Sequence, residues 1–216
     1  WQGHDMIVII NPNSTVSMTQ AMLVTARETA PDAVIEGWTS HDGPPAIEGP
    51  DDGDASVPPL LKLVQEATQK GASAIIIGCF DDTGLEEARE IATCPVIGIG
   101  QAAYFTAALA GERFSVVTTL PVSIPTLEAN IHSYGLKGQL ARVRASGVAV
   151  LALENDPEGS RQLVLQEVAK AATEDNVQSV ILGCAGMVDL HGSRTAEQSV
   201  LLIDGVRAAT KICTLF

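Results

Sequence analysis

Two cysteines follow similar apolar runs in the two halves of the sequence. Gly71 to Asp82 reads GASAIIIGCFDD and Asn176 to Asp189 reads NVQSVILGCAGMVD, so a Gly-Cys pair ends each run. Short β-branched runs of this kind fit central strands of a parallel sheet, which places Cys79 and Cys184 where their strands end. Ligands of open α/β sheets bind at that edge. The repeat therefore favours two thiols that converge on one ligand.

Two thiols on opposite sides of one carbon atom could invert a stereocentre. One removes a proton from the first face and the other delivers a proton to the second, so neither base nor substrate has to turn over. A free thiol has a pKa of about 8.5, and a modest shift would make either protonation state accessible. Reacting contacts of about 3 to 3.5 Å on each side would hold the sulfurs roughly 7 Å apart. That separation is too long for a disulfide.

The composition limits the other readings of the chain. A hydrophobic fraction of 46% in 216 residues is enough for a sizeable core. A net charge of −13 with 13 Lys and Arg argues against a nucleic-acid partner. No apolar run reaches the roughly 18 residues of a membrane span, and no signal segment precedes Met6, which we expect to be the natural start. The four cysteines form no CxxC pair, so we expect reduced thiols in a cytoplasmic protein and no metal.

Strand-like and helical patterns alternate along the chain. We expect strands near residues 6–10, 34–38, 72–78, 94–100, 114–118, 177–183 and 200–203, one strand with an irregular partner within 140–153, and helices over 15–29, 60–70, 85–92, 101–110, 124–134, 157–174 and 204–213. This alternation predicts parallel βαβ units, and the repeat predicts an internal duplication. The predicted fold is α/β, with two pseudo-symmetric Rossmann-like domains, mostly parallel sheets and an active site in the interdomain cleft. We expect residues 6–100 with 204–216 to form one domain and 101–203 the other.

Polar residues also gather where the first strand should end. Asn11-Pro12-Asn13-Ser14-Thr15 could cradle a small polar ligand, or Ser14 or Thr15 could simply cap the following helix. His41 to Gly53 is rich in Gly, Pro and Asp, which predicts an exposed loop that either covers a site or is plain surface.

The remaining candidates have simpler explanations. Asp81 and Asp82 are the kind of residues that form turns and helix caps, so we leave them out of the acid/base pair. His191 follows the Cys184 loop and could touch the site. A free cysteine is usually a small buried hydrophobe, and we assign Cys94 and Cys213 to packing on that ground.

Six motifs in order make the sequence recognisable as a whole. They are INPNST at residues 10–15, GCFDDTGL at 78–85, VIGIGQAA at 96–103, SVVTT at 115–119, SVILGCAGM at 179–187 and IDGV at 203–206. Together they resemble the hydantoin racemase branch of the aspartate/glutamate racemase superfamily over essentially the whole chain after residue 5.

The resemblance implies a two-domain α/β racemase that uses two cysteines, no cofactor and no metal, and that forms a homo-oligomer. It makes Cys79 and Cys184 the acid/base pair. It also implies ligand-holding positions at Asn13, Ser14, Thr118 and Thr119, and main-chain N–H groups after each cysteine, at Phe80, Asp81, Ala185 and Gly186, that hold a carbonyl or carboxylate.

The residues after the cysteines narrow the expected substrate. Amino-acid racemases of the superfamily carry Asn-Thr and Thr-His there, whereas this chain has Phe80-Asp81 and Ala185-Gly186. Losing those polar partners favours a less charged ring, and the expected substrate is a 5-monosubstituted hydantoin. Allantoin is the nearest alternative. A decarboxylase of the arylmalonate type, a reaction like that of maleate isomerase and a non-catalytic small-molecule binding protein stay open.

Overall fold

Parallel β-strands form two separate four-stranded sheets in the computed structural model, which describes residues 6–111, 113–190 and 200–216. The first sheet has the order β2-β1-β3-β4, with β1 at Met6–Asn11, β2 at Val34–Thr39, β3 at Ala74–Ile77 and β4 at Val96–Gly98. The second has the order β6-β5-β7-β8, with β5 at Phe114–Thr118, β6 at Leu140–Ala145, β7 at Ser179–Gly183 and β8 at Leu201–Asp204. The two orders correspond strand for strand, as a duplication predicts.

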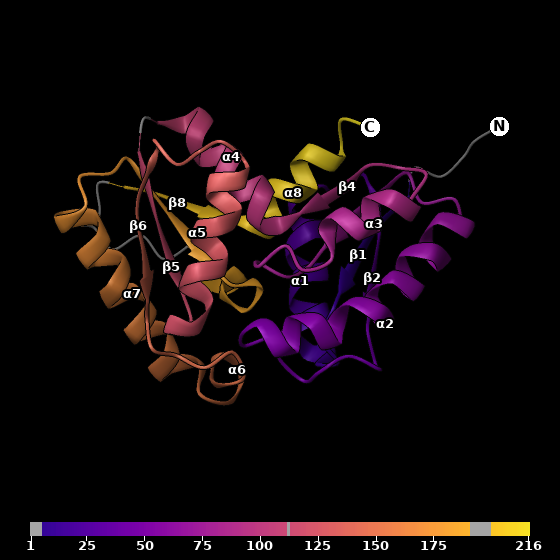
Figure 1. Ribbon diagram of the computed structural model, residues 1–216, viewed down its shortest axis with the longest axis horizontal. Coiled ribbons are helices and arrows are strands. Elements are labelled where there is room, and N and C mark those ends of the chain that lie inside the picture. The colour runs from indigo at the N-terminus through magenta and orange to yellow at the C-terminus, as the bar shows by residue number, and fades with distance from the viewer. Residues whose placement is uncertain (1–5, 112, 191–199) are drawn as a thin grey trace.

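Helices cover both faces of each sheet. They are α1 (Val16–Thr29), α2 (Pro50–Gln69), α3 (Leu85–Ile91), α4 (Ile99–Ala110), α5 (Ile124–Ser133), α6 (Ala152–Asn155), α7 (Pro157–Glu174) and α8 (Gly205–Cys213), with 3-10 turns at Pro121–Ser123 and Ala185–Leu190. Figure 1 shows two lobes side by side, with α2 and α7 on the outer flanks and α8, in yellow, between the lobes. The α/β prediction with parallel sheets is confirmed.

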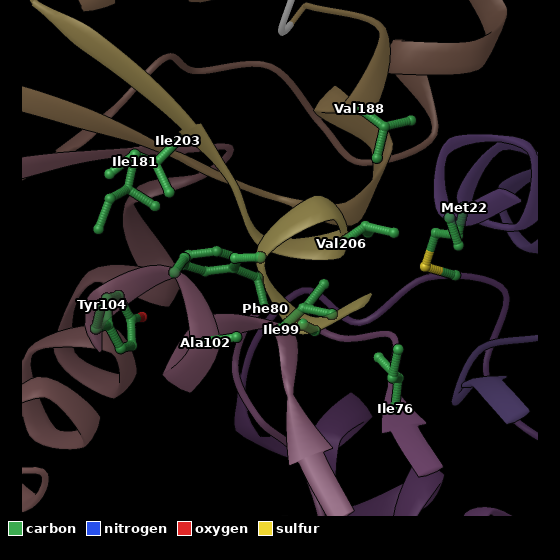
Figure 2. Packing of buried hydrophobic residues seen from close by; sticks show 14 of the residues in the cluster. Met22, Ile76, Phe80, Ile99, Ala102, Tyr104, Ile181, Val188, Ile203 and Val206 are labelled. Atoms are coloured by element: carbon green, nitrogen blue, oxygen red, sulfur yellow. The ribbon is translucent and has the colours of Figure 1, made fainter. Parts of the chain in front are cut away.

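One hydrophobic core joins the two sheets through the helices between them. It contains residues from the inner faces of both sheets and from α1, α4, α5 and α8. Figure 2 shows part of this cluster, in which the Phe80 ring meets the Tyr104 ring edge to face at a centroid distance of 5.4 Å. Separate clusters seal the outer faces, under α2 and α3 on one side and under α7 on the other. The sheets are therefore held by a shared inner layer, which fixes how their strand ends face each other.

The glycine before each cysteine sits where neighbouring elements leave little room for a side chain, a helix and a strand at Gly78 and a strand at Gly183. A Cβ on Gly78 would lie 2.8 Å from Met22 and 3.1 Å from the Ile10 carbonyl oxygen. A Cβ on Gly183 would lie 2.9 Å from a Val116 methyl and 3.0 Å from the Val117 carbonyl oxygen. The Gly-Cys pair is thus a packing requirement at both strand ends.

The segment between β2 and α2 corrects one prediction. We expected an exposed loop over His41 to Gly53 and a helix from Leu60, but α2 already begins at Pro50 and continues through Pro58 and Pro59. Pro50 in the first turn and the acidic residues after it are helix-start signals that the Gly, Pro and Asp content obscured. The loop that remains, residues 40–49, is not fully exposed, because Ala46 and Ile47 are buried.

No helix in the described part of the chain is long and apolar enough to cross a membrane.

Candidate active site

The carboxyl ends of β3 and β7 open onto one small cavity between the two sheets. Its free volume is about 40 Å³. It is lined from the first half by Asn13, Met18, Ile47, Gly78, Cys79, Phe80 and Asp81, and from the second by Thr118, Thr119, Ser123, Val150, Gly183, Cys184, Ala185 and Gly186. Both thiols that the repeat singled out therefore reach the same space, and the corresponding strands of the two sheets deliver them.

All the predicted site residues except Ser14 line this cavity. The Ser14 N–H donates to the Pro44 carbonyl oxygen at 2.9 Å, so this residue holds the 40–49 segment instead. The Phe80 side chain is buried in the core, and the cavity meets this residue beside Cys79. His191 lies outside the described residues.

Sequence reasoning missed several lining residues: Met18, Ile47, Gly78, Ser123, Val150 and Gly183. The glycines carry a signal, because each directly precedes a cysteine. Ile47 carries a weaker one, as an apolar side chain within a polar loop. The sequence around Ser123 and Val150 does not identify them as lining residues, because their position depends on how the two halves pack together.

Asn11 organises the polar corner at the end of β1. Its side-chain nitrogen donates to Asn13 Oδ1 at 2.9 Å and to Thr19 Oγ1 at 3.0 Å, and its own Oδ1 accepts from the Asn13 N–H. Asn13 Oδ1 also accepts from the Thr15 N–H at 3.0 Å, and Thr15 Oγ1 donates to the Pro45 carbonyl oxygen at 2.7 Å. Of this corner only Asn13 reaches the cavity, and neither Ser14 nor Thr15 caps α1 with its hydroxyl.

The Cys79 thiol lies among polar and acidic groups. Its Sγ is 3.5 Å from Thr83 Oγ1, and the Asp81 N–H also hydrogen-bonds to it. Burial raises the pKa of Cys79 to about 12, the negative charges of Asp81 and Asp82 add to that rise, and the two hydrogen bonds oppose it.

The Cys184 thiol has fewer polar neighbours. Burial raises its pKa to about 12 as well, and the hydrogen bond from the Gly186 N–H opposes the rise. Each sulfur thus accepts an N–H from the residue two positions further along the chain. The more distant charges of Asp81 and Glu48 also raise the pKa of Cys184.

These values correct the expectation of a modest shift. With pKa values of about 12, the thiol form of both cysteines predominates in the free protein at neutral pH, because burial disfavours the charged thiolate. A thiolate formed there is in turn a stronger base than an ordinary one, which suits a weakly acidic C–H bond. The main-chain N–H groups after the two cysteines also differ. A 3-10 turn begins directly after Cys184, whereas α3 begins only at Leu85, six residues after Cys79.

Asp81 is the one charged side chain among the residues that line the cavity. Burial raises its pKa to about 6. No Lys or Arg belongs to the described lining, so nothing there balances a carboxylate brought in by a ligand. Within the described part of the chain no group of His, Cys, Asp and Glu is arranged to hold a metal ion.

Contacts between the two halves lie beside the cavity. The Val150 N–H donates to Glu48 Oε1 at 2.6 Å, and Ser17 Oγ donates to Glu154 Oε2 at 2.6 Å. Met18, Ala46 and Val150 form a small apolar cluster beside Cys184. The 40–49 segment of the first half is thereby fastened to the segment before α6 in the second half.

Comparisons with known proteins show what the whole chain is similar to. Residues 7–213 match the family described as Asp/Glu/Hydantoin racemase. A hydantoin racemase from Rhizobium meliloti is 43% identical over 95% of this chain and 86% of its own. The structure of an allantoin racemase from Klebsiella pneumoniae is 35% identical, with a TM-score of 0.94 over 97% of this chain and 86% of that one. A glutamate racemase from Francisella tularensis, at 20% identity and a TM-score of 0.72, shares the fold over 98% of this chain and 80% of its own.

The chain belongs to the Asp/Glu/hydantoin racemase family. It is accordingly an isomerase of the racemase class, and the resemblance to hydantoin racemases is confirmed.

Proposed function

We propose that the protein racemises 5-monosubstituted hydantoins without a cofactor, with Cys79 and Cys184 as acid and base on opposite faces of C5. The observation that carries the proposal is that both thiols line one cavity from corresponding strand ends. A second support is the 43% identity to the hydantoin racemase from Rhizobium meliloti. In the part of the chain that the structure describes, these two are the only cysteines in the lining.

The proposed reaction moves one proton onto the enzyme and one off it. The thiolate of one cysteine takes the C5 proton, and the C–H electron pair passes into the ring as an enolate on the adjacent carbonyl. The thiol of the other cysteine then protonates C5 from the opposite face. Main-chain N–H groups and the hydroxyls of Thr119 or Ser123 are available to stabilise the oxyanion, whereas the Thr118 hydroxyl donates to the Gly183 carbonyl oxygen at 3.1 Å. The two cysteines exchange protonation states in each turnover, so the next turnover can run in the reverse direction.

The charge of the cavity supports a ring over a free amino acid. An amino acid brings a carboxylate, which would meet Asp81 and no lining Lys or Arg. A hydantoin carries that carbon as an uncharged ring carbonyl, which needs hydrogen-bond donors only. We therefore assign the carbonyl-holding role to the main chain after each cysteine and leave Asp81 facing the substituent.

Allantoin is the second candidate substrate, because the structural relative from Klebsiella pneumoniae is named an allantoin racemase. Its ureido substituent offers N–H donors to the Asp81 carboxylate, whereas Met18, Ile47 and Val150 offer an apolar lining to an alkyl or aryl substituent. Comparing kcat/KM for allantoin with that for alkyl- and arylalkyl-hydantoins decides between the two.

Exchange in D2O tests the proposal directly. One enantiomer of a 5-monosubstituted hydantoin is incubated with the protein, and proton NMR at C5 and optical rotation are followed together. We expect deuterium to enter C5 as rotation is lost, at rates well above the spontaneous ones. If the protein binds the hydantoin but speeds up neither deuterium exchange nor loss of rotation, it is a non-catalytic binding protein and the proposal is wrong.

A further inference from the structure

The turn that follows Cys79 is held by an unusual carboxylate. Asp82 lies in the left-handed backbone region, with a φ of 52°, and its side chain is buried. Its two oxygens accept from the Gly100 N–H at 3.0 Å, the Gln101 N–H at 2.7 Å and the Tyr134 hydroxyl at 2.9 Å. The carboxylate therefore ties the Cys79 turn to the first turn of α4, where exposed N–H groups favour a negative charge.

Two glycines make the space that this carboxylate occupies. A Cβ on Gly98 would collide with Asp82 Oδ1, and a Cβ on Gly100 would lie 2.8 Å from Asp82 Oδ2 and collide with the Phe80 carbonyl oxygen. Gly98 has a φ of −81°, so its backbone does not require glycine. The two glycines of Gly98-Ile99-Gly100 are therefore needed to make room for the Asp82 carboxylate.

The C-terminal part of helix α5 in the second half and Tyr134, its C-cap residue, add two donors to the same turn. Asn130 Nδ2 donates to the Asp81 carbonyl oxygen at 2.7 Å, beside the Tyr134 bond to Asp82. Residues four apart lie on one face of a helix, so both donors point the same way. Leu127 and Ile131 of α5 are fully buried in the shared core. The Cys79 turn of the first half is therefore held by hydrogen bonds from an element of the second half.

We infer that Asp82, Asn130 and Tyr134 form a clamp that positions Cys79 relative to Cys184. This rests on the proposed function, because inversion needs both sulfurs at reacting distance from one carbon, and a shift of about 1 Å can cost on the order of 100-fold in rate. The three are positioning residues, since none of them lines the cavity. The clamp acts across the joint between the halves, where two separately folded sheets have to be brought into register.

Tyr134→Phe and Asn130→Ala test the clamp, with Tyr104→Phe as the matched control. Each test variant should lower kcat for racemisation about 10-fold and leave KM within about twofold, because it removes one hydrogen bond on the turn and none on the substrate. Tyr104→Phe should keep kcat within about twofold, since its buried hydroxyl has no hydrogen-bond partner in the described structure. Thermal unfolding checks that all three variants fold.

Alkylation of the single thiols separates positioning from general loosening. In Tyr134→Phe, the rate of Cys79 carboxamidomethylation by iodoacetamide should rise about three- to tenfold as the turn loosens, while that of Cys184 stays within about twofold. Peptide mass spectrometry measures both rates in one sample. An unchanged kcat, or a Cys79 rate that does not change relative to that of Cys184, overturns the proposal.

The Asp82 variants give a graded check. Asp82→Asn keeps a carbonyl oxygen as acceptor and should retain part of the kcat that Asp82→Ala loses. If Asp82→Ala does not fold, Tyr134→Phe still decides. Should the wild-type protein fail to racemise hydantoins, the proposed function falls, whereas the alkylation rates still show whether α5 holds the Cys79 turn.

Discussion

The Cys79 and Cys184 turns occupy equivalent places in two sheets of the same strand order, yet they are held by different means. The first turn has acidic residues and hydrogen bonds to α4 and α5. The second continues directly into a short 3-10 turn, and its thiol packs against an apolar cluster and accepts one N–H. The two thiols occupy corresponding positions, but the environments around them differ. Symmetry of position therefore does not imply symmetry of proton affinity or of mobility.

The edge strands differ between the halves in the same way. In the second half, Arg144 of β6 is buried and forms a two-pronged ion pair with Asp175, at 2.7 and 2.6 Å. Ser115 Oγ donates to the same carboxylate at 2.7 Å. In the first half, Trp38 of β2 carries the exposed Lys70 ammonium 4.6 Å from its ring. The second half thus depends on a buried ion pair that the first half does without.

Removing either thiol should have the largest effect on activity. Cys79→Ser and Cys184→Ser should each lower racemisation by about 1,000-fold or more, because a hydroxyl replaces an acid or base that every turnover uses. Polarimetry measures the loss. Cys94→Ser is the matched control, since Cys94 is a partly exposed cysteine outside the cavity, and it should stay within about twofold of the wild type. Full activity in either active-site variant would contradict a two-thiol mechanism.

Breaking the buried ion pair should have the next largest effect, on stability. Asp175→Asn should lower the free energy of unfolding by about 1.5 to 3 kcal/mol, because it removes the two-pronged partner of the buried Arg144 charge and leaves its single contacts to Glu167 and Glu174. Urea unfolding measures this, with Glu66→Gln as the control for an exposed pair, expected to cost less than about 1 kcal/mol.

The stability difference should also depend on pH. Hydrogen bonds and charge from Arg144 lower the pKa of Asp175 below its ordinary value despite its burial. The stabilisation is therefore present above the unfolded pKa of about 3.9 and is lost as pH falls through the lower folded value. Wild type and Asp175→Asn should converge in stability in strong acid, and a difference that stays constant with pH would contradict the ion pair as its cause.

The smallest predicted effect concerns the influence of Asp81 on the pKa values of the two thiols. The charge of Asp81 raises the pKa of both thiols, and the main-chain N–H of Asp81 hydrogen-bonds to the Cys79 sulfur, which places this residue beside Cys79. Asp81→Asn should therefore lower the pKa of Cys79 more and speed its alkylation by roughly two- to tenfold at fixed pH. In the wild type, the rate should rise about tenfold per pH unit between pH 7 and 10, as expected for pKa values of about 12. If Asp81→Asn sped up the alkylation of Cys79 and Cys184 equally, Asp81 would not act mainly on Cys79.

The sequence was most informative where a local pattern decides the structure. The β-branched runs at β3 and β7 predicted their strands and the cavity position of both cysteines, because a strand buried on two faces must be apolar. The start of α2 was misplaced because Gly, Pro and Asp are common in loops and in first helical turns alike.

Residues whose role depends on the joint between the halves could not be predicted. Asp82 was read as a turn or cap residue; it does cap a helix, but α4 lies 18 residues further along the chain. Val150 and Ser123 reach the cavity only because the inner helices set the two sheets at one particular distance. Such placements follow from packing between segments that are distant in the sequence, and the hydrophobic periodicity of a single segment contains no information about that packing.

The small cavity has a kinetic consequence. At about 40 Å³ it has room for about three water molecules, which is less than a hydantoin ring needs, so the lining residues have to move apart before such a ring can bind. The hydrogen bond between Glu48 and Val150 and the apolar residues beside Cys184 join the two halves at this place. The fraction of molecules open at any moment then scales the apparent affinity. At high substrate concentration, the rate of opening sets an upper limit on how fast ligand can bind.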